Sequence, residues 1–314
     1  MTDHQDALVT KTLWRYRELF DEGLTRRDVQ HLLADGDLRR LRKNCYVPEA
    51  HWASLTAVER LALRAEAHHH SLIGRPTMQH VYSHETAAVL HGLELWRPGT
   101  EVHVTQPTRT SNSSHGPDVR NHSAELTDDD VVLLHGLPTT SLQRTAVDCA
   151  RSLSFDQALI VVDQCRARGV DRAGALTALD LLGPVTGSAR ARDVIVASDP
   201  SSESPGESLA RIRLRRLALP AAQCQVEVLT RLGLYRLDFA WPDLRVGLEF
   251  DGRTKYFGAI PTDEVLYQER RRERALVEAG WTIIRIEWDD LFREAQLEAR
   301  LRGALDGAAR RTVA

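Results

Sequence analysis

The sequence predicts an α+β protein of three domains. Residues 1–75 are rich in Arg and Leu, with apolar residues at helical spacing. Residues 76–200 begin with short apolar runs between turn signals and end in helical patterns. Residues 201–314 hold two strand patterns joined by a tight turn, with helical patterns on either side. A length of 314 residues suits two or three compact units better than a single core.

Composition excludes several classes of protein. Lys and Arg number 41 and Asp and Glu 44, so the net charge of -3 excludes a basic footprint over the whole chain. Any nucleic-acid contact must therefore come from local patches. Hydrophobic residues at 42% and charged residues at 27% exclude extensive disorder.

The chain also has the features of a cytoplasmic protein with no membrane partner. Its longest strongly apolar stretches, such as residues 159–162, are far shorter than the roughly 20 residues of a membrane helix. The polar, acidic start excludes a secretory signal. The four cysteines are widely spaced and form no CxxC pair, which indicates free thiols in a reducing compartment.

The first domain has the pattern of a winged helix-turn-helix. A helix is expected over residues 12–22, and a second begins at the cap Thr25, with Asp28 at its third position, and ends at Gly36. Residues 37–47 predict a two-stranded wing that turns at Asn44, since Asn tolerates the left-handed conformation of a tight tip.

Basic and polar side chains at the start of the second helix and on the wing predict contacts with DNA. These residues are Arg26, Arg27, Gln30, Arg39, Arg40, Arg42 and Lys43. Short helix-turn-helix patterns are weak by themselves, so a small helical module for protein partners is the alternative.

Residues 24–27 and 36–48 resemble the N-terminal domain of AbiEi-type antitoxins, which are transcriptional repressors of type IV toxin–antitoxin systems. Residues 83–93 and 137–148 resemble the middle of the same proteins. The resemblance implies a DNA-binding regulator. The chain departs from the family at Asn44, where the wing tip usually has Gly.

The middle domain is an α/β connector with a strand over residues 101–105 and a helix over 139–152. Ten of the 13 histidines lie between His68 and His135, which raises the question of a metal. His84 and Glu85 begin like a zinc-protease helix, but Ala88 breaks the HExxH motif. These histidines are interpreted as scattered structural residues.

A polar loop over residues 198–206, rich in Ser and Pro, is the best domain boundary. The third domain then begins with a helix. Ser204 is its N-cap, and Glu207 lies in its first turn. The elements expected after it are strands over 225–229, 235–241 and 245–251, a helix over 262–279, a strand over 281–288 and a helix over 291–305.

Side-chain alternation in the hairpin separates apolar from acidic residues. Burying one apolar set requires Asp238 to share the other face with Glu249 and Asp251. The apolar set is Leu237, Phe239, Trp241, Val246, Leu248 and Phe250.

Three acids on one sheet face repel each other, and a divalent metal relieves that repulsion. Hard oxygen ligands suit Mg²⁺ or Mn²⁺. Lys255 would neutralise developing charge, and Glu207 is an additional candidate ligand. The alternative is a half-exposed hairpin whose acids face solvent and pair with Arg236 and Arg245.

Residues 203–305 resemble the very-short-patch-repair-like branch of the PD-(D/E)XK nuclease fold, and more closely the domain-of-unknown-function family 559 common in actinobacteria. The resemblance rests on Asp238, on residues 249–252, on Lys255 and on residues 269–273 and 280–286. It implies a central mixed sheet flanked by helices, with Asp238 and Glu249 as metal carboxylates. Asp251 stands where the motif has Lys, and Lys255 is its displaced substitute.

The expected function is a Mg²⁺- or Mn²⁺-dependent endonuclease acting on DNA. One alternative is a non-enzymatic regulator of the antitoxin kind, and another is a defence nuclease that needs a second subunit or a homodimer. In the helix over 262–279 the arginines either face phosphates or form a solvated face with neighbouring glutamates. These are Arg270, Arg271, Arg272 and Arg274.

Overall fold

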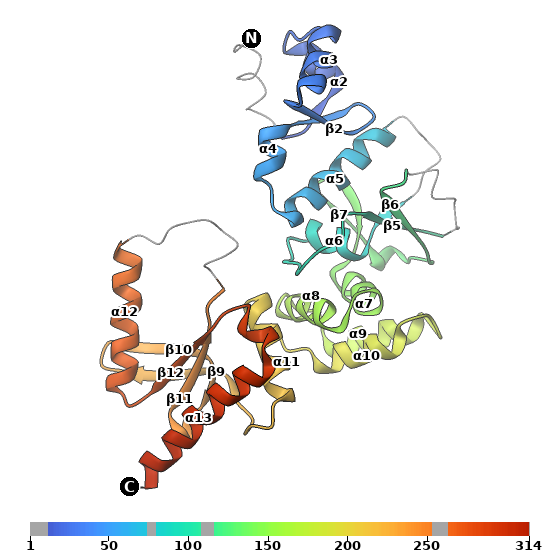
Figure 1. Cartoon of the computed structure of the whole chain (residues 1–314). Coiled ribbons are helices and arrows are strands. Elements are labelled where there is room, and N and C mark those ends of the chain that lie inside the picture. The colour runs from blue at the N-terminus through green and yellow to red at the C-terminus, as the bar shows by residue number, and fades with distance from the viewer. Residues whose placement is uncertain (1–11, 74–79, 108–115, 253–262, 314) are drawn as a thin grey trace. The chain divides into compact units, whose positions relative to one another are not determined.

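The computed structural model describes residues 12–73, 80–107, 116–252 and 263–313 (Figure 1). The chain divides into two compact units between Ser198 and Asp199. The first unit contains both segments that the sequence separates at residue 75. Both units combine helices with sheets, so the predicted α+β class is confirmed.

The first unit opens with a small antiparallel sheet in the order β1-β3-β2. Its elements are β1 Trp14–Arg15, α2 Tyr16–Asp21, α3 Arg26–Asp35, β2 Leu38–Arg42 and β3 Cys45–Pro48. The expected helix from residue 12 is wrong at its start, because Trp14 and Arg15 pair with Tyr46 and Cys45. Pairing distant in sequence buries Trp14 and overrides the local helical pattern.

Local signals in this segment are realised as predicted. The hydroxyl of Thr25 accepts from the Asp28 N–H at 3.2 Å, and the Asp28 carboxylate accepts from the Thr25 N–H at 2.8 Å. Gly36 ends α3 with a φ of 81°. Asn44 turns between β2 and β3 with a φ of 65°.

The rest of the first unit contains a five-stranded mixed sheet in the order β6-β5-β4-β8-β7 and, over the described residues, seven further α-helices. Its strands are β4 Val81–Tyr82, β5 Val102–Gln106, β6 Val119–Ser123, β7 Val131–Leu134 and β8 Leu137–Thr140. The helices are α4 Glu49–Ser54, α5 Ala57–Leu72, α6 His84–Leu90, α7 Leu142–Ser152, α8 Phe155–Ala167, α9 Arg172–Leu181 and α10 Ser188–Ala197. The strand expected over 101–105 is β5. The helix expected from 139 begins only at Leu142, because the preceding residues pair as β8 with β7 and β4.

The second unit is a four-stranded mixed sheet in the order β12-β11-β10-β9. Its elements are α11 Pro205–Arg216, β9 Gln223–Thr230, β10 Gly233–Trp241, β11 Val246–Phe250, α12 Asp263–Glu278, β12 Thr282–Ile286 and α13 Glu294–Val313. β11 and β12 are parallel, and the other pairs are antiparallel. The helix α12 covers one face of the sheet, and α11 and α13 cover the other (Figure 1).

The predicted alternation in the hairpin holds only near its turn. Phe239 pairs with Leu248 and Ala240 with Gly247, as alternation requires. Leu237 is different, because it packs with Ala240 and with Leu276 of α12. A regular strand would place residues 237 and 240 on opposite faces, so the alternation breaks at Asp238. The prediction that Leu237 shares a face with Phe239 was therefore wrong.

Both faces of the hairpin are covered by other elements. The alternative of a half-exposed hairpin whose acids face solvent therefore does not hold. Leu237, Ala240, Val246 and Leu248 are all fully buried. Within the described residues no helix is both long enough and apolar enough to cross a bilayer. All four cysteines are free thiols.

Candidate functional site

The start of α11 fixes the first acid of the site. The Ser204 hydroxyl accepts from the Glu207 N–H at 3.2 Å, as a cap does. The Glu207 carboxylate accepts from the Ser204 hydroxyl at 2.8 Å and from the Glu203 N–H at 2.9 Å. These bonds hold Glu207 in place although it is buried.

Gln225 on β9 joins Glu207, and the sequence did not indicate it. Its side-chain N–H donates to the Glu207 carboxylate at 2.9 Å. Its amide oxygen is buried and has no hydrogen-bond partner among the described residues. Gln225 has a φ of 54°, and the β9–β10 pairing skips it and Asp238. A strained backbone of this kind carries no sequence signal, because Gln has no preference for it.

Asp238 occupies the irregular position of β10. Its carboxylate accepts from the Phe250 N–H on β11 at 2.8 Å. A backbone donor thus fixes one of the two carboxylate oxygens where the strand alternation breaks.

Glu249 lies on β11 and faces α12. Its carboxylate accepts from the Arg272 guanidinium of α12 at 2.6 Å. Arg285, its register partner on β12, lies 3.8 Å away. Arg272 also donates to the Arg236 carbonyl at 2.8 Å and lies over the Tyr235 ring.

Asp238 influences the other two acids of the site. Burial raises the pKa of Glu207, Asp238 and Glu249 above the ordinary values. The charge of Asp238 raises the pKa of both Glu207 and Glu249. The Phe250 N–H and the Arg272 charge oppose the rise at Asp238. The site therefore holds three crowded carboxylates from α11, β10 and β11.

A hollow of about 470 Å³ opens beside Asp238. Two cationic side chains, Arg236 and Arg272, line it together with acidic and apolar residues. The remaining lining residues are Glu203, Glu227, Leu234 and Tyr235.

The other predicted acid-site residues lie apart or cannot be placed. The Asp251 N–H donates to the Ile286 carbonyl at 2.8 Å, which extends the β11–β12 pairing by one residue. Lys255 lies outside the described residues. Over the described parts of the chain, no three of the acids bring ligand atoms within 4.8 Å of one another.

The residues expected to contact DNA fall into two groups. The exposed group comprises Arg26, Arg27, Gln30, Arg40 and Lys43.

The second group is held by acids of its own unit. Arg39 donates to Glu49 at 2.6 and 2.8 Å. Arg42 pairs with Asp118 at 2.5 Å, and its side chain is only 10% exposed. Arg42 therefore does not project from the wing as expected, because a carboxylate of the neighbouring sheet holds it.

The α12 arginines also divide. Arg270, Arg271 and Arg274 are exposed, whereas Arg272 reaches the acid site. Two glutamates of α12 bind arginines outside the helix, since Glu273 lies 3.8 Å from Arg285 and Glu278 pairs with Arg231.

Comparison with known proteins gives few relatives. No protein-family model matches the chain. It is 33% identical over 167 residues to two curated Mycobacterium tuberculosis proteins, "Uncharacterized protein MT2308" and "Uncharacterized protein Rv2248". The match spans 52% of this chain and 60% of each relative. The crystal structure of the RV2827C protein from Mycobacterium tuberculosis aligns with a TM-score of 0.40 at 14% identity, over 71% of this chain and 85% of that one.

Proposed function

We propose that this protein binds DNA and hydrolyses phosphodiester bonds at Glu207, Asp238 and Glu249 with the help of Mg²⁺ or Mn²⁺. The observation that carries the proposal is that carboxylates from α11, β10 and β11, one buried and two half-buried, lie close enough for the charge of Asp238 to raise the pKa of the other two. Burying charges in this way is costly unless a cation compensates them.

The donor set fits a hard divalent cation. Carboxylate and amide oxygens are the ligands that Mg²⁺ and Mn²⁺ prefer. The unpartnered amide oxygen of Gln225 adds a neutral oxygen next to Glu207. When bound, the metal supplies a Lewis acid for a phosphoryl oxygen and a water of lowered pKa.

The hollow beside the acids fits the substrate. Arg236 and Arg272 line it, and guanidinium groups hold phosphate oxygens well. Phosphate binding would also draw Arg272 away from Glu249 and free that carboxylate. The mixed sheet with helices on both faces supports the proposal, since a PD-(D/E)XK resemblance implies this architecture.

The first unit supplies DNA binding in this proposal, as a winged-helix domain. Two helices are followed by a two-stranded ladder, and exposed cations lie at the start of α3 and at the ladder tip. This arrangement supports contact with the DNA backbone.

One observation favours the second candidate, a regulator without catalysis. The Arg272 guanidinium donates to the Glu249 carboxylate at 2.6 Å and supplies the positive charge that a metal ion would otherwise provide. An acid site neutralised by arginine would then be structural, and the second unit would only bind DNA or a partner.

A plasmid-nicking assay with Mg²⁺ or Mn²⁺ separates the two candidates. We expect the wild type to nick, and Asp238→Asn and Glu249→Gln to lose at least about 100-fold in rate, because both change a proposed ligand. The matched control is Glu287→Gln, an exposed acid of the second unit that does not line the hollow, and it should keep its activity.

Two outcomes would contradict the nuclease proposal. A wild-type protein that neither nicks DNA nor binds Mn²⁺ in calorimetry would favour the regulator. Full activity in Asp238→Asn would place the chemistry at another site.

A further inference from the structure

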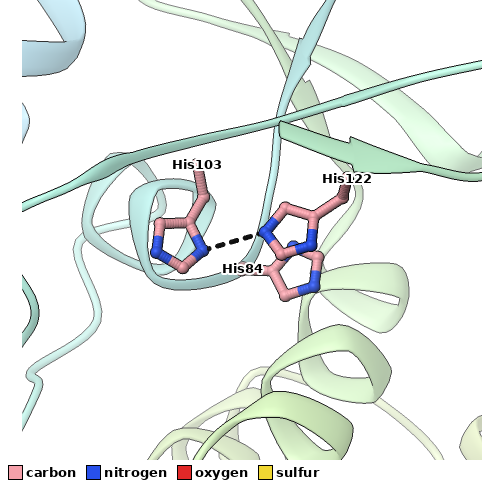
Figure 2. Close-up of side chains that lie close together, drawn as sticks. All are labelled: His84, His103 and His122. Carbon is pink, nitrogen blue, oxygen red and sulfur yellow. Dashed lines mark hydrogen bonds between the residues drawn. The ribbon is translucent and has the colours of Figure 1, made fainter. Parts of the chain in front are cut away.

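Three histidines of the first unit lie together, far from the acid site in the sequence (Figure 2). His84 is the first residue of α6, His103 lies on β5 and His122 on β6. One ring nitrogen of each lies within 4.8 Å of the other two. Within the described parts of the chain, they are the only group of three His, Cys, Asp or Glu side chains this close.

The rings face one another at short range. His103 Nδ1 and His122 Nε2 are 3.2 Å apart, and Figure 2 shows these two nitrogens pointing together. The His84 ring stacks on the His122 ring, with centroids 3.6 Å apart and planes at 14°. The three rings thus bring one nitrogen each within 4.8 Å of the other two.

The far sides of two rings are held by oxygen atoms. His84 Nδ1 lies 2.9 Å from the Ser83 hydroxyl, which also accepts from Thr105 at 2.8 Å. His103 Nε2 lies 3.8 Å from the Glu85 carboxylate. Oxygen partners on the outer nitrogen orient histidine ligands and fix their tautomer at many metal sites.

The rings are neutral at physiological pH. Burial lowers the pKa of His103 to about 3, helped by the His122 imidazole and by Arg120. Burial lowers the pKa of His122 to about 4, helped by Arg120 and Arg151. Burial lowers the pKa of His84 well below its ordinary value. Each ring therefore keeps a lone pair that a metal can accept.

We propose that His84, His103 and His122 form a binding site for Zn²⁺, with the fourth position left to water. Three imidazoles and one open position are a common zinc ligand set. Zinc–nitrogen bonds of about 2.05 Å at tetrahedral angles separate two nitrogens by about 3.3 Å, close to the 3.2 Å between His103 and His122. Nitrogen donors disfavour Mg²⁺ and Ca²⁺, so this ion differs from the one proposed for the acid site.

Zn²⁺ binding needs one small change. The lone pairs of stacked rings run parallel, so one ring must turn about its side-chain bonds. His122 is the least buried of the three, so we assign the turn to it. In the ligating tautomers, the protons lie on His84 Nδ1 toward Ser83 and on His103 Nε2 toward Glu85.

The positive charges that surround the rings are compensated. Arg144 and Arg151 of α7 lie near the cluster, and both pair with Asp148, at 3.1 and 3.6 Å. Arg120 pairs with Glu101 at 3.9 Å. These acids, together with Glu85, limit repulsion of a divalent cation.

The backbone at His84 adds a second indication. Its φ of 54° is uncommon for any residue other than Gly, and the side chain is buried. Strain of this kind persists where the surrounding structure holds a residue for a purpose.

The experiment titrates the untagged, metal-free full chain with Co²⁺, which gives visible absorption bands in a tetrahedral nitrogen site, and then displaces Co²⁺ with Zn²⁺. We expect one equivalent to bind. His122→Asn and His84→Asn should each weaken Zn²⁺ binding by at least about 100-fold, since each loses a direct ligand. Asn suits position 84 because it tolerates positive φ.

The matched control is His135→Asn, an exposed histidine of the same unit that also has positive φ, and it should bind like the wild type. Circular dichroism of each metal-free variant checks folding, and if His84→Asn fails to fold, the half-buried His122→Asn decides. The proposal is overturned if the wild type shows no tetrahedral Co²⁺ spectrum. Unchanged affinity in His122→Asn, or loss of binding in the control His135→Asn, overturns it as well.

Discussion

Gly206 is the residue whose identity the tertiary structure constrains most sharply in the second unit. A Cβ atom there would lie 1.8 Å from the Phe250 ring. Gly206→Ala must push Phe250, and with it the end of β11, away from α11. We expect a loss of about 2 kcal/mol or more in the free energy of unfolding, measured by urea denaturation of the second unit.

The control is Gly303→Ala in α13. Nothing lies within 4 Å of a Cβ at that position. Alanine should therefore stabilise the helix by roughly 0.5–1 kcal/mol. Equal effects of the two substitutions would mean that α11 does not approach β11 so closely.

Two residues with positive φ mark the two candidate sites. Gln225 contacts Glu207 of the acid site, and His84 belongs to the histidine cluster. Positive φ is uncommon for any residue other than Gly, and the type of neither residue predicted it here. Asn44 is the opposite case, since its residue type predicted the turn.

At the scale of an element, α5 begins with a complete capping box. The Glu59 carboxylate accepts from the Thr56 N–H at 2.7 Å and from its hydroxyl at 2.8 Å. These two bonds lower the pKa of Glu59. A depressed pKa means that ionised Glu59 contributes stability above its unfolded-state pKa, and that this contribution is lost as pH falls through the folded-state value.

Glu59→Gln should therefore destabilise the first unit by about 0.5 kcal/mol at pH 7, and the difference should vanish in acid below the lowered pKa. Denaturant unfolding over a pH series measures this. Glu22→Gln is the control, because Glu22 is the C-cap of α2, where a negative charge opposes the helix dipole. If the stability difference between the wild type and Glu59→Gln grew toward low pH, the predicted direction of the pH dependence would be wrong.

The β2–β3 ladder supports a prediction about DNA. Arg40 and Lys43 are exposed, whereas Arg39 and Arg42 are bound to acids. If the exposed pair contacts phosphates, Arg40→Ala with Lys43→Ala should weaken DNA binding for all sequences. The slope of log affinity against log salt should fall by about 1.8, at about 0.9 per lost contact.

The control variant also removes two positive charges, but from another part of the first unit. Arg190 and Arg192 of α10 are exposed, and their double alanine variant should keep the wild-type slope. Fluorescence anisotropy with labelled duplex at several salt concentrations gives the slopes. Identical slopes in both double variants would exclude the ladder as a DNA contact.

At the scale of the whole molecule, the division after Ser198 predicts two independently folding fragments. The Ser198 carbonyl accepts from Arg166 and Arg172 of the first unit, and the Asp199 carboxylate accepts from Ser201 of the second. Fragments 1–198 and 199–314 should each unfold cooperatively on heating, and their summed circular dichroism should match that of the full chain.

The control fragment ends at residue 182 and so lacks α10. Ala191, Val194 and Ile195 of α10 are fully buried, and their loss exposes the cores of α7 and α8. That fragment should melt at lower temperature or without a clear transition. A fragment 199–314 without cooperative unfolding would contradict the division.

Helices and turns with local sequence signals could be predicted before the structure was known. Caps, glycine stops and turn residues placed α3, α11 and the β2–β3 ladder, because these signals act through hydrogen bonds within a few residues. The sequence also singled out Asp238 and Glu249, since acids are rare inside strands and stand out in the pattern.

Features that depend on partners distant in sequence became visible only in the folded structure. The β1 strand exists because it pairs with β3, and Arg42 is held by Asp118, 76 residues away. The break in alternation at Asp238 and the buried amide oxygen of Gln225 arise from an irregularity of the sheet that the residue types do not predict. Successive members of the histidine cluster are 19 residues apart along the chain, and only the β5–β6 pairing and the β4–α6 connection bring them together. Such contacts depend on how strands pair, and a single sequence carries no local signal of that pairing.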